Sequence, residues 1–271
     1  MAKVAFQGER GAFSEDAAAK LFGKNIDCLP CVRLKEVFES VSQDKVDFGV
    51  VPVENSQAGS INETYDLLLA YPLNIFGEVI LKVSHCLMAL PGEKLADIAT
   101  IYSHPQALAQ CDEFLGKLKV EIVPSYDTAG SAKMIREKKL RNCAAIASKR
   151  AANLYGLEIL APEIETNVSN YTRFVAISKQ KAKAARRNKT SLVFATEHKP
   201  GSLYRILGIF TTRDINLTKL ESRPSRATPW EYVFYADFEG HLDREVYQEA
   251  LRELQRETTF IKILGSYPQA T

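Results

Sequence analysis

The stretch Lys3–Gly23, KVAFQGERGAFSEDAAAKLFG, joins an apolar run to a helical pattern. The run KVAFQG is typical of a short buried strand, because its apolar residues include β-branched and aromatic side chains. Ser14 stands at the expected N-cap of a helix and Gly23 at its expected end. Glu15 and Asp16 fall in the first turn, where they complement the helix dipole. The chain is therefore expected to begin with a strand followed directly by a helix.

Further strand and helix patterns follow in the same alternating order as far as residue 162. The first group is NIDCLPC, LKEVFESVSQ, DFGVVPVE and NETYDLLLAY, and the second is CLMAL, ATIYSH, PQALAQCDEFLGKL, VEIVPS, TAGSAKMIREKK, CAAIAS and KRAANLYG. Such an alternation predicts an α/β fold with mostly parallel sheets covered by helices. We expect two lobes: lobe 1 from about 1–80 with 163–180, and lobe 2 from about 81–162.

Two extended segments are expected to connect the lobes. LNIFGEVILKVSHCLMAL (73–90) lies between the two halves, and residues 171–178 return to a strand after the second half. Ligands of open α/β sheets bind where the carboxyl ends of strands meet the starts of helices. A ligand cleft between the lobes is therefore predicted.

The last eighty residues follow a different order. SLVFAT, SLYRILGIFTTR, NLTKLESRP, EYVFYADF, REVYQEALRELQRE and FIKILGSY give strand, helix, strand, strand, helix, strand. This βαββαβ order is the split-βαβ pattern of ferredoxin-like modules. We expect such a module over 190–271.

A basic segment separates these regions. Lys179–Lys189, KQKAKAARRNK, holds six basic residues, no acidic residue and little that can be buried. It is typical of a linker, and we assign the linker to 181–189. A nucleic-acid-binding arm is the alternative, but it would need stacking aromatics or basic residues spread over a folded face.

Composition limits the classes of partner. The chain has 271 residues, 25% of them charged, with a net charge of +2. So small an excess of charge argues against nucleic acid or a membrane surface as a partner and favours a small-molecule ligand. The start MAKVAFQGERGAF lacks the features of a signal peptide, and no apolar run approaches the roughly 18 residues of a membrane span. A cytoplasmic protein is expected.

The cysteines give little sign of disulfide or metal chemistry. Five cysteines are an odd number for a disulfide framework, and they suit a reducing compartment. Cys28 and Cys31 form a C-x-x-C pair, which can be a redox centre or half of a zinc site. No second pair completes a zinc set, so buried structural thiols are the preferred interpretation and no metal site is expected.

Three stretches carry candidate functional residues. Glu54 and Asn55 stand where the strand DFGVVPV stops, and Ser103 precedes His104-Pro105-Gln106 at a strand-to-helix junction, with Gln110 on the same helix face as Gln106. In NYTRF, Thr172 and Arg173 come just before the apolar run that begins at Phe174. Each stretch alone has a plainer interpretation as a turn, a helix cap or a solvated glutamine pair.

Together these stretches resemble the bacterial prephenate dehydratases over nearly the whole chain. The resemblance rests on GERGAFSE, VPVENS with GSI, YSHPQ, NYTRF and, in the C-terminal region, LTKLESRP of an ACT regulatory domain. It implies a two-lobed catalytic domain like that of periplasmic binding proteins over 1–180. It also implies conversion of prephenate to phenylpyruvate, with loss of carbon dioxide and of the ring hydroxyl. No redox step occurs, so no cofactor is expected.

The resemblance also implies roles for individual residues. Thr172 is expected to donate a hydrogen bond toward the leaving hydroxyl, and Arg173 to clamp a substrate carboxylate, with Glu54 as a third catalytic residue. A threonine hydroxyl has a pKa far above neutrality, so we expect an oriented donor or relay rather than a free-standing acid. His104 remains an alternative candidate for the proton donor. The implied substrate-binding residues are Asn55, Ser103, Gln110 and Phe174.

An ACT domain implies phenylalanine as an allosteric inhibitor and a homodimer or homotetramer. The implied effector residues are Gly201, Ser202, Leu203, Asn216, Leu217, Glu221, Ser222, Arg223 and Pro224. Ser202 stands where the family has alanine, and its added hydroxyl is expected to change the affinity for a benzyl group. Inhibition requires a second state of the cleft, for which we expect lobe closure.

Two other functions stay open. Arogenate, which carries an amine in place of the keto group, is the nearest alternative substrate, and the cleft motifs do not separate it from prephenate. A bilobed amino-acid sensor without catalysis is a second alternative, against which Thr172 and Arg173 count. Because no chorismate mutase segment precedes residue 1, we expect dehydratase activity alone.

Overall fold

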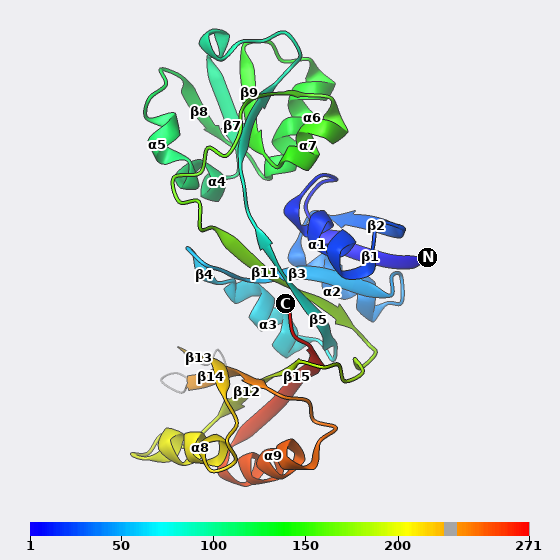
Figure 1. The fold of residues 1–271 in the computed structure, drawn as a ribbon, viewed down its shortest axis with the longest axis vertical. Coiled ribbons are helices and arrows are strands. Elements are labelled where there is room, and N and C mark those ends of the chain that lie inside the picture. The colour runs from blue at the N-terminus through cyan, green and yellow to red at the C-terminus, as the bar shows by residue number, and fades with distance from the viewer. Residues whose placement is uncertain (225–231, 271) are drawn as a thin grey trace. The chain divides into compact units, whose positions relative to one another are not determined.

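A computed structural model describes residues 1–224 and 232–270, which form three sheets (Figure 1). The first sheet has the order β2-β1-β3-β11-β5, with β4 paired to β3. β1 runs parallel to both of its neighbours, as the alternating pattern predicts. Its strands are β1 (Ala2–Gln7), β2 (Ile26–Cys31), β3 (Phe48–Asn55), β4 (Gly59–Ser60), β5 (Asn74–Lys82) and β11 (Tyr171–Ser178), and its helices are α1 (Phe13–Phe22), α2 (Leu34–Ser42) and α3 (Asn62–Ala70).

The second sheet has the order β10-β6-β9-β7-β8. Here β7 runs parallel to β8 and β9, whereas β6 is antiparallel to its neighbours. The strands are β6 (Cys86–Ala89), β7 (Thr100–Ser103), β8 (Glu121–Pro124), β9 (Cys143–Ala147) and β10 (Glu158–Ala161). The helices are the 3₁₀ turn η1 (Leu95–Asp97), α4 (Pro105–Gln110), α5 (Asp112–Leu115), α6 (Thr128–Lys138) and α7 (Lys149–Tyr155).

Two details of this lobe differ from expectation. The single helix expected over PQALAQCDEFLGKL is divided into α4 and α5 at Cys111, whose backbone leaves helical geometry and whose side chain is fully buried. Burial of Cys111 in the core therefore bends the chain where the sequence pattern is continuous. The strand β10 was not expected, since Glu158–Ala161 is too short for a clear pattern.

Both faces of the second sheet are buried. Alternate residues of β6 point to opposite sides, so that Cys86 and Met88 join α6 and α7 in one core while Leu87 and Ala89 join α4 and α5 in another. This explains why the strand reads as a continuous apolar run, as expected of a sheet covered on both faces.

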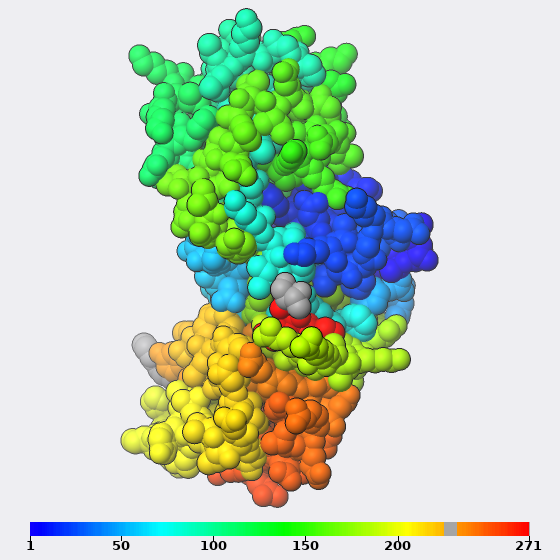
Figure 2. Space-filling view, in the orientation of Figure 1, coloured from blue at the N-terminus to red at the C-terminus, as the bar shows by residue number. Residues whose placement is uncertain are grey.

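The loop after β1 contacts the second lobe. The Ser148 hydroxyl donates to the Gly11 carbonyl at 2.7 Å, and Arg150 pairs with Glu15 at 3.2 Å. A Cβ on Gly11 would lie 3.0 Å from the Ala151 backbone, so glycine permits this close approach. In the space-filling view the blue N-terminal atoms meet the green atoms of this lobe (Figure 2).

The third sheet confirms the βαββαβ order expected at the C-terminus. Its strands are antiparallel in the order β13-β14-β12-β15. Side chains of both helices, such as Phe210 and Leu254, pack with Phe194 and Phe238 against one face of the sheet. The elements are β12 (Asn188–Ala195), α8 (Ser202–Thr211), β13 (Leu217–Pro224), β14 (Tyr232–Glu239), α9 (Glu245–Glu257) and β15 (Phe260–Pro268).

The contacts divide the chain into two compact units. The first is Met1–Thr64 with Ile80–Phe174, and the second is Tyr65–Val79 with Val175–Thr271. Most of α3 and of β5 therefore belongs with the C-terminal sheet, although both elements precede the second lobe in sequence. The boundaries 1–180, 181–189 and 190–271 remain a prediction made from the sequence.

Inside the second unit, α3 is fixed to the C-terminal sheet at several points. Lys262 of β15 donates to the carbonyl groups of Leu68, Leu69 and Tyr71 at 2.8–2.9 Å. Leu68 and Leu69 lie in the last turn of α3 and Tyr71 directly follows it, where carbonyls have no intrahelical partner and a cation is favoured. The ring of Tyr65 packs edge-on against Tyr235 of β14, with 4.8 Å between centroids.

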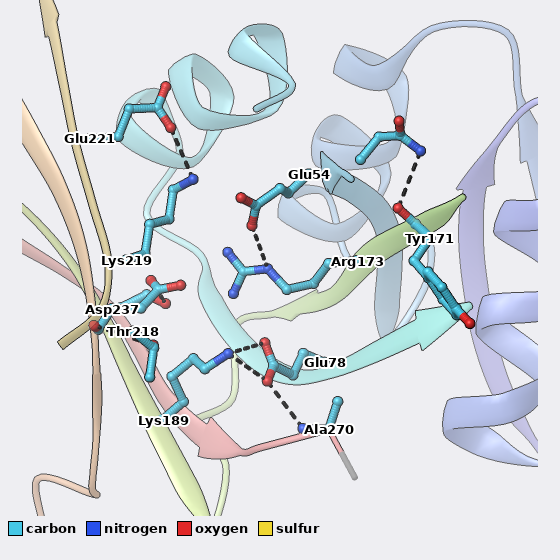
Figure 3. Close-up of polar contacts among 12 residues, drawn as sticks. Glu54, Glu78, Tyr171, Arg173, Lys189, Thr218, Lys219, Glu221, Asp237 and Ala270 are labelled. Atoms are coloured by element: carbon cyan, nitrogen blue, oxygen red, sulfur yellow. Dashed lines mark hydrogen bonds and ion pairs between the residues drawn. The ribbon is translucent and has the colours of Figure 1, made fainter. Parts of the chain in front are cut away.

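A buried ion pair also lies inside this unit. The Lys189 ammonium is 2.9 and 3.1 Å from the two carboxylate oxygens of Glu78, and the Ala270 amide donates to the same carboxylate (Figure 3). The side chains are 9% and 1% exposed, so solvent screens the pair little.

We predict that Lys189→Met destabilises the protein by about 3 kcal/mol, because it removes the ammonium from a buried carboxylate. The free energy of unfolding, measured by urea titration, checks this. Lys183→Met is the control, since Lys183 is exposed and carries the same charge. Equal midpoints for the two variants would contradict the prediction.

Candidate active site

A hollow of about 180 Å³ lies in the first unit, where β3, β11 and the connection at residues 83–85 meet helices of both lobes. It brings together three of the residues expected to bind substrate, Asn55, Gln110 and Phe174, with Thr172. The full lining is Phe13, Ser14, Pro52, Asn55, Ile61, Val83, His85, His104, Gln106, Ala107, Gln110, Thr128, Thr172 and Phe174.

Three helices begin at this hollow. Phe13 and Ser14 open α1, His104 caps α4, and Thr128 is the first residue of α6. The first backbone N–H groups of a helix have no intrahelical acceptor, and the helix dipole adds positive potential at this end. No lysine or arginine is among the lining residues. The Asp127 carboxylate caps α6, His104 caps α4, and Glu15 and Asp16 lie in the first turn of α1, so the protein's own side chains partly offset the attraction that these dipoles offer an anion.

One side-chain amide organises the floor of the hollow. Asn55 Nδ2 donates to Asn170 Oδ1 at 2.8 Å, to Thr172 Oγ1 at 2.9 Å and to the Tyr171 carbonyl at 3.2 Å. Its Oδ1 accepts from the amides of Gln57 and Ala58, both at 3.0 Å. Asn55 thus ties the end of β3 to the start of β11.

This bond orients the Thr172 hydroxyl. Because the Asn55 amide donates to Oγ1, an oxygen lone pair is occupied and the hydroxyl hydrogen is available to another acceptor. Thr172 is 8% exposed and lines the hollow, so that acceptor can be a bound ligand. The geometry suits the expected oriented donor.

His85 is the main residue of the hollow that the sequence analysis missed. Its Nε2 lies 3.0 Å from Gln110 Oε1, its backbone N–H donates to Glu165 at 2.9 Å, and the ring meets Phe13 edge-on at 5.7 Å. Because Gln110 supplies an acceptor, Nε2 carries the hydrogen, and Nδ1 is left as a buried lone pair without a partner in the described parts of the chain. Burial lowers the pKa of His85, so its neutral form is favoured.

No local pattern in VSHCLMAL identified His85. A single histidine in an apolar run is usually a packed core residue, and only the tertiary contact with Gln110 reveals its place. Ser14, expected as the N-cap of the first helix, is the second residue of α1, whose N-cap is Ala12. Neither Ser14 nor Asn170 was assigned to the site, although both lie in quoted motifs. A search of those motifs for small polar residues beside Thr172 would have included Asn170, which is fully buried.

Three other expected site residues, Arg173, Glu54 and Ser103, are not among the lining residues of this hollow. Arg173 and Thr172 are neighbours on a strand and point to opposite faces, and the Arg173 guanidinium pairs with Glu54 at 3.3 Å (Figure 3). Ser103 is fully buried and donates to the Ile146 carbonyl at 2.6 Å. His104 Nδ1 accepts from the Gln106 amide, which matches the cap expected from its position before proline. The catalytic and binding roles of Arg173, Glu54 and Ser103 remain predictions.

The cysteine pair lies on an edge strand. Cys28 and Cys31 are in β2, and burial raises the pKa of both thiols, which disfavours reactive thiolates. Across the described ranges 1–224 and 232–270, no group of three His, Cys, Asp or Glu side chains is placed to hold a metal ion. In the same ranges, no helix is long and apolar enough to cross a membrane.

The expected effector residues are distributed over two places. Ser202 and Leu203 line a hollow of about 240 Å³ after β12, together with His198, Tyr232 and others. Gly201, with φ 82°, is the N-cap before Ser202. The remaining ones lie beyond this hollow: Asn216 donates to Glu239 at 3.4 Å, and Leu217, Glu221, Ser222, Arg223 and Pro224 lie on the edge strand β13.

Arg223 of this set contacts α3. Its guanidinium is 3.2 Å from the Asp66 carboxylate and lies over the Tyr235 ring at 5.5 Å. Lys219, on the same face of β13, lies over the Tyr65 ring at 5.3 Å. The segment expected to bind an effector is therefore in direct contact with a helix of the catalytic region.

Comparisons with known proteins agree with this architecture. A prephenate dehydratase family model matches residues 4–182, and an ACT domain model matches residues 190–256. An Arabidopsis thaliana protein named arogenate dehydratase/prephenate dehydratase 2 is 45% identical over 99% of this chain and 73% of its own length. A bifunctional chorismate mutase/prephenate dehydratase of Aquifex aeolicus is 40% identical over 99% of this chain and 74% of its own.

Two solved structures share the fold over nearly the whole chain. Prephenate dehydratase of Arthrobacter aurescens, in complex with L-Phe, has a TM-score of 0.89 and 32% identity over 98% of this chain and 89% of that one. A structure described as GqqA, a novel type of quorum quenching acylase, has a TM-score of 0.88 and 35% identity over 98% of each chain.

Fold and site thus define a two-lobed α/β domain with a small hollow where three helices begin, followed by a ferredoxin-like module. The chain belongs to the prephenate dehydratase family and carries a C-terminal ACT domain. The resemblance and the fold class expected from the sequence are confirmed.

The lowered pKa of His85 predicts a pH dependence of stability. The unfolded chain binds the His85 proton at its ordinary value of 6.5, whereas the folded protein does so only at lower pH. As the pH falls below about 6.5, the unfolded state therefore gains protons first and stability declines.

His85→Gln should lose less stability than the wild type between about pH 7 and pH 5, as measured by urea unfolding at each pH. His198→Gln, at an exposed position, serves as the control. Parallel pH profiles for the wild type and His85→Gln would show that His85 is not the group responsible.

Proposed function

We propose that this protein converts prephenate to phenylpyruvate by decarboxylating dehydration. The observation that carries the proposal is the Thr172 hydroxyl, which Asn55 orients in a hollow where three helices begin. Membership of the prephenate dehydratase family supports the same reaction. Prephenate is a dianion, and helix N-termini suit carboxylates.

The reaction needs one proton and no redox partner. The bond between the ring and its carboxylate breaks and releases carbon dioxide, while the electron pair moves into the ring. The carbon–hydroxyl bond breaks at the far side of the ring, and the departing hydroxide takes up a proton to leave as water. An oriented hydrogen bond from Thr172 stabilises the charge that develops on this oxygen.

The absence of cationic side chains from the lining suits decarboxylation. A guanidinium on the departing carboxylate would stabilise the charge that has to flow into the ring, and so would oppose the reaction. Dipoles from α1, α4 and α6 are weaker and spread over the hollow. In this proposal the Glu54–Arg173 pair supports β3 and β11 from the opposite face, and direct binding of a substrate carboxylate by Arg173 is the alternative.

Arogenate is the second candidate substrate, because several relatives carry that name. The lining favours prephenate. Arogenate bears an ammonium group, and the hollow is lined by no aspartate or glutamate side chain that would pair with it. A keto group needs only a hydrogen-bond donor, which Gln106 or a helix N–H supplies.

Phenylalanine is the proposed inhibitor. The hollow beside Ser202, Leu203 and Phe234 is the place for its ring, and the relative from Arthrobacter aurescens was solved with L-Phe. We further propose a cytoplasmic homodimer or homotetramer. In the described chain β13 pairs only with β14, so its outer edge is available to a second copy.

The helix α3 is the proposed route of inhibition. Its start is attached to β3: the Ile61 amide donates to the Val53 carbonyl at 2.9 Å, and the Thr64 hydroxyl donates to the Pro52 carbonyl at 2.7 Å. Ile61 also lines the proposed substrate hollow. Farther along, α3 is held by Arg223 and Lys262. A rearrangement of β13 that draws Arg223 away from Asp66 would change the support of α3. An effector that favours that rearrangement would have a differential affinity for the two states.

Thr172→Ala should lower kcat for phenylpyruvate formation from prephenate by about 10²–10³-fold, because it removes the oriented donor. Thr172→Ser should retain most activity, since the hydroxyl remains. Arogenate is assayed in parallel, and Thr212→Ala, at the exposed residue that follows α8, is the control. Equal activity of Thr172→Ala and the wild type would exclude Thr172 as the donor; no turnover of prephenate by the wild type would refute the proposed reaction.

Lys262→Met should leave kcat/KM for prephenate within about threefold while raising the phenylalanine concentration for half inhibition at least fivefold. Calorimetry should show phenylalanine binding retained, because Lys262 lies outside the effector hollow. Lys138→Met, at an exposed position of α6, is the control. Unchanged inhibition of Lys262→Met would exclude this route, and a wild type insensitive to phenylalanine would refute the regulatory proposal itself.

A further inference from the structure

The basic segment before the C-terminal sheet contains an ordered turn. Asn188 Oδ1 accepts from the Ala185 amide and Nδ2 donates to the Ala185 carbonyl, both at 2.7 Å. The Gly240 amide donates to the Asn188 carbonyl at 2.9 Å, and the Gln269 amide to the Arg187 carbonyl at 3.1 Å. Arg186 and Arg187 are therefore carried on a turn that is fixed at both ends, not on a loose linker.

This turn forms one wall of a hollow of about 230 Å³. The opposite wall is Arg244, Tyr247 and His241, at the end of β14 and the start of α9. The Arg244 guanidinium lies over the Tyr247 ring at 5.7 Å, and a Cβ on Gly240 would fall 2.1 Å from that ring, so glycine is needed for the ring to pack there.

Among the residues that the structure describes, the positive charges of this hollow outnumber the negative ones. Within residues 1–224 and 232–270, none of the Arg186, Arg187 and Arg244 guanidinium groups forms an ion pair. Glu239 is the single acidic side chain of the lining, and it accepts a hydrogen bond from Asn216 at 3.4 Å. The thirteen-residue helix α9 also begins here without a side-chain cap, which adds positive potential.

A buried histidine supplies independent evidence. His241 is 5% exposed and lines both this hollow and a neighbouring one beside Ile75 and Ser266. Its Nδ1 accepts from the Asp243 amide at 3.2 Å, with the Asp243 carboxylate 3.3 Å away. When Nδ1 of the neutral ring accepts the amide hydrogen, the ring hydrogen is on Nε2. When both ring nitrogens carry a hydrogen, Nδ1 faces the carboxylate and Nε2 still carries its own. That N–H is buried without an acceptor in the described chain. A buried donor without a partner is costly, and an anion would satisfy it.

We propose that this hollow binds a small anion with several carboxylate groups or a phosphate group. Three guanidinium groups, a helix N-terminus and a buried imidazole N–H are all donors, and guanidinium forks match carboxylate and phosphate oxygens in pairs. The site is separate from the hollow beside Ser202. Asn188 begins β12, whereas the other hollow follows its last residue, Ala195, so the two lie at opposite ends of the strand.

The test uses the full-length protein and isothermal titration with inorganic phosphate and with citrate, at ionic strength held constant with potassium chloride. We expect phosphate, citrate or both to bind saturably, with one ligand per protein chain. The tighter of the two shows whether the hollow prefers a phosphate group or carboxylate groups. Arg187→Gln and Arg244→Gln should each weaken that binding at least tenfold. Arg252→Gln, an exposed arginine on the same helix, should leave it unchanged.

Circular dichroism in potassium chloride checks that the variants fold, and Arg187→Gln keeps the Arg244–Tyr247 contact in case Arg244→Gln disturbs α9. The proposal is overturned if neither anion binds beyond the effect of chloride, or if Arg252→Gln weakens binding as much as the other two. It is also overturned if binding survives in both Arg187→Gln and Arg244→Gln, because the anion would then occupy another place, such as the substrate hollow.

Discussion

The active-site geometry depends on the hydrogen bonds of the Asn55 side chain. Asn55 is 5% exposed, and its Nδ2 joins the end of β3 to Asn170, Tyr171 and Thr172, more than a hundred positions later in the chain. Its Oδ1 accepts from the first turn after β3. Both ends of the amide are thus used, which is the condition under which a buried polar group stabilises a unique arrangement. The position of Thr172, the floor of the hollow and the turn that leads to α3 all follow from this one side chain.

The electrostatic design follows from strand alternation. A strand places neighbouring residues on opposite faces, so Thr172 and Arg173 cannot both point into one hollow from a regular β11. The structure places the hydroxyl at the ligand side and the guanidinium at Glu54. In the proposed function, the backbone at three helix starts would meet the negative charge of a substrate. Dipoles of this kind are fixed before the ligand arrives, so little reorganisation is needed as charge moves during the reaction.

Much of this could be predicted from the sequence, for identifiable reasons. The alternation of elements gave the α/β lobes and the βαββαβ module, because period and element length are local properties. Thr172, Asn55, Gln110 and Phe174 lie in motifs and meet in one hollow. His85 was missed because its partner Gln110 is 25 residues away and no local pattern joins them. The break at Cys111 was missed because burial in the core, not propensity, decides where α4 ends.

The largest departure from a sequence-based view concerns α3. By sequence it belongs to the first lobe, but its contacts place Tyr65–Val79 in the unit of the C-terminal sheet. The reason is physical: α8 and α9 cover one face of that sheet, and Tyr235 on the other face needs a partner, which Tyr65 provides. Lys262 then satisfies three carbonyls at the end of α3 that would otherwise need water. A helix held in this way cannot shift relative to the ACT sheet without breaking those bonds, while its first turn remains attached to the strand that carries Asn55. Under the proposed regulation, α3 carries the effect of the effector, so no long chain of side chains is required.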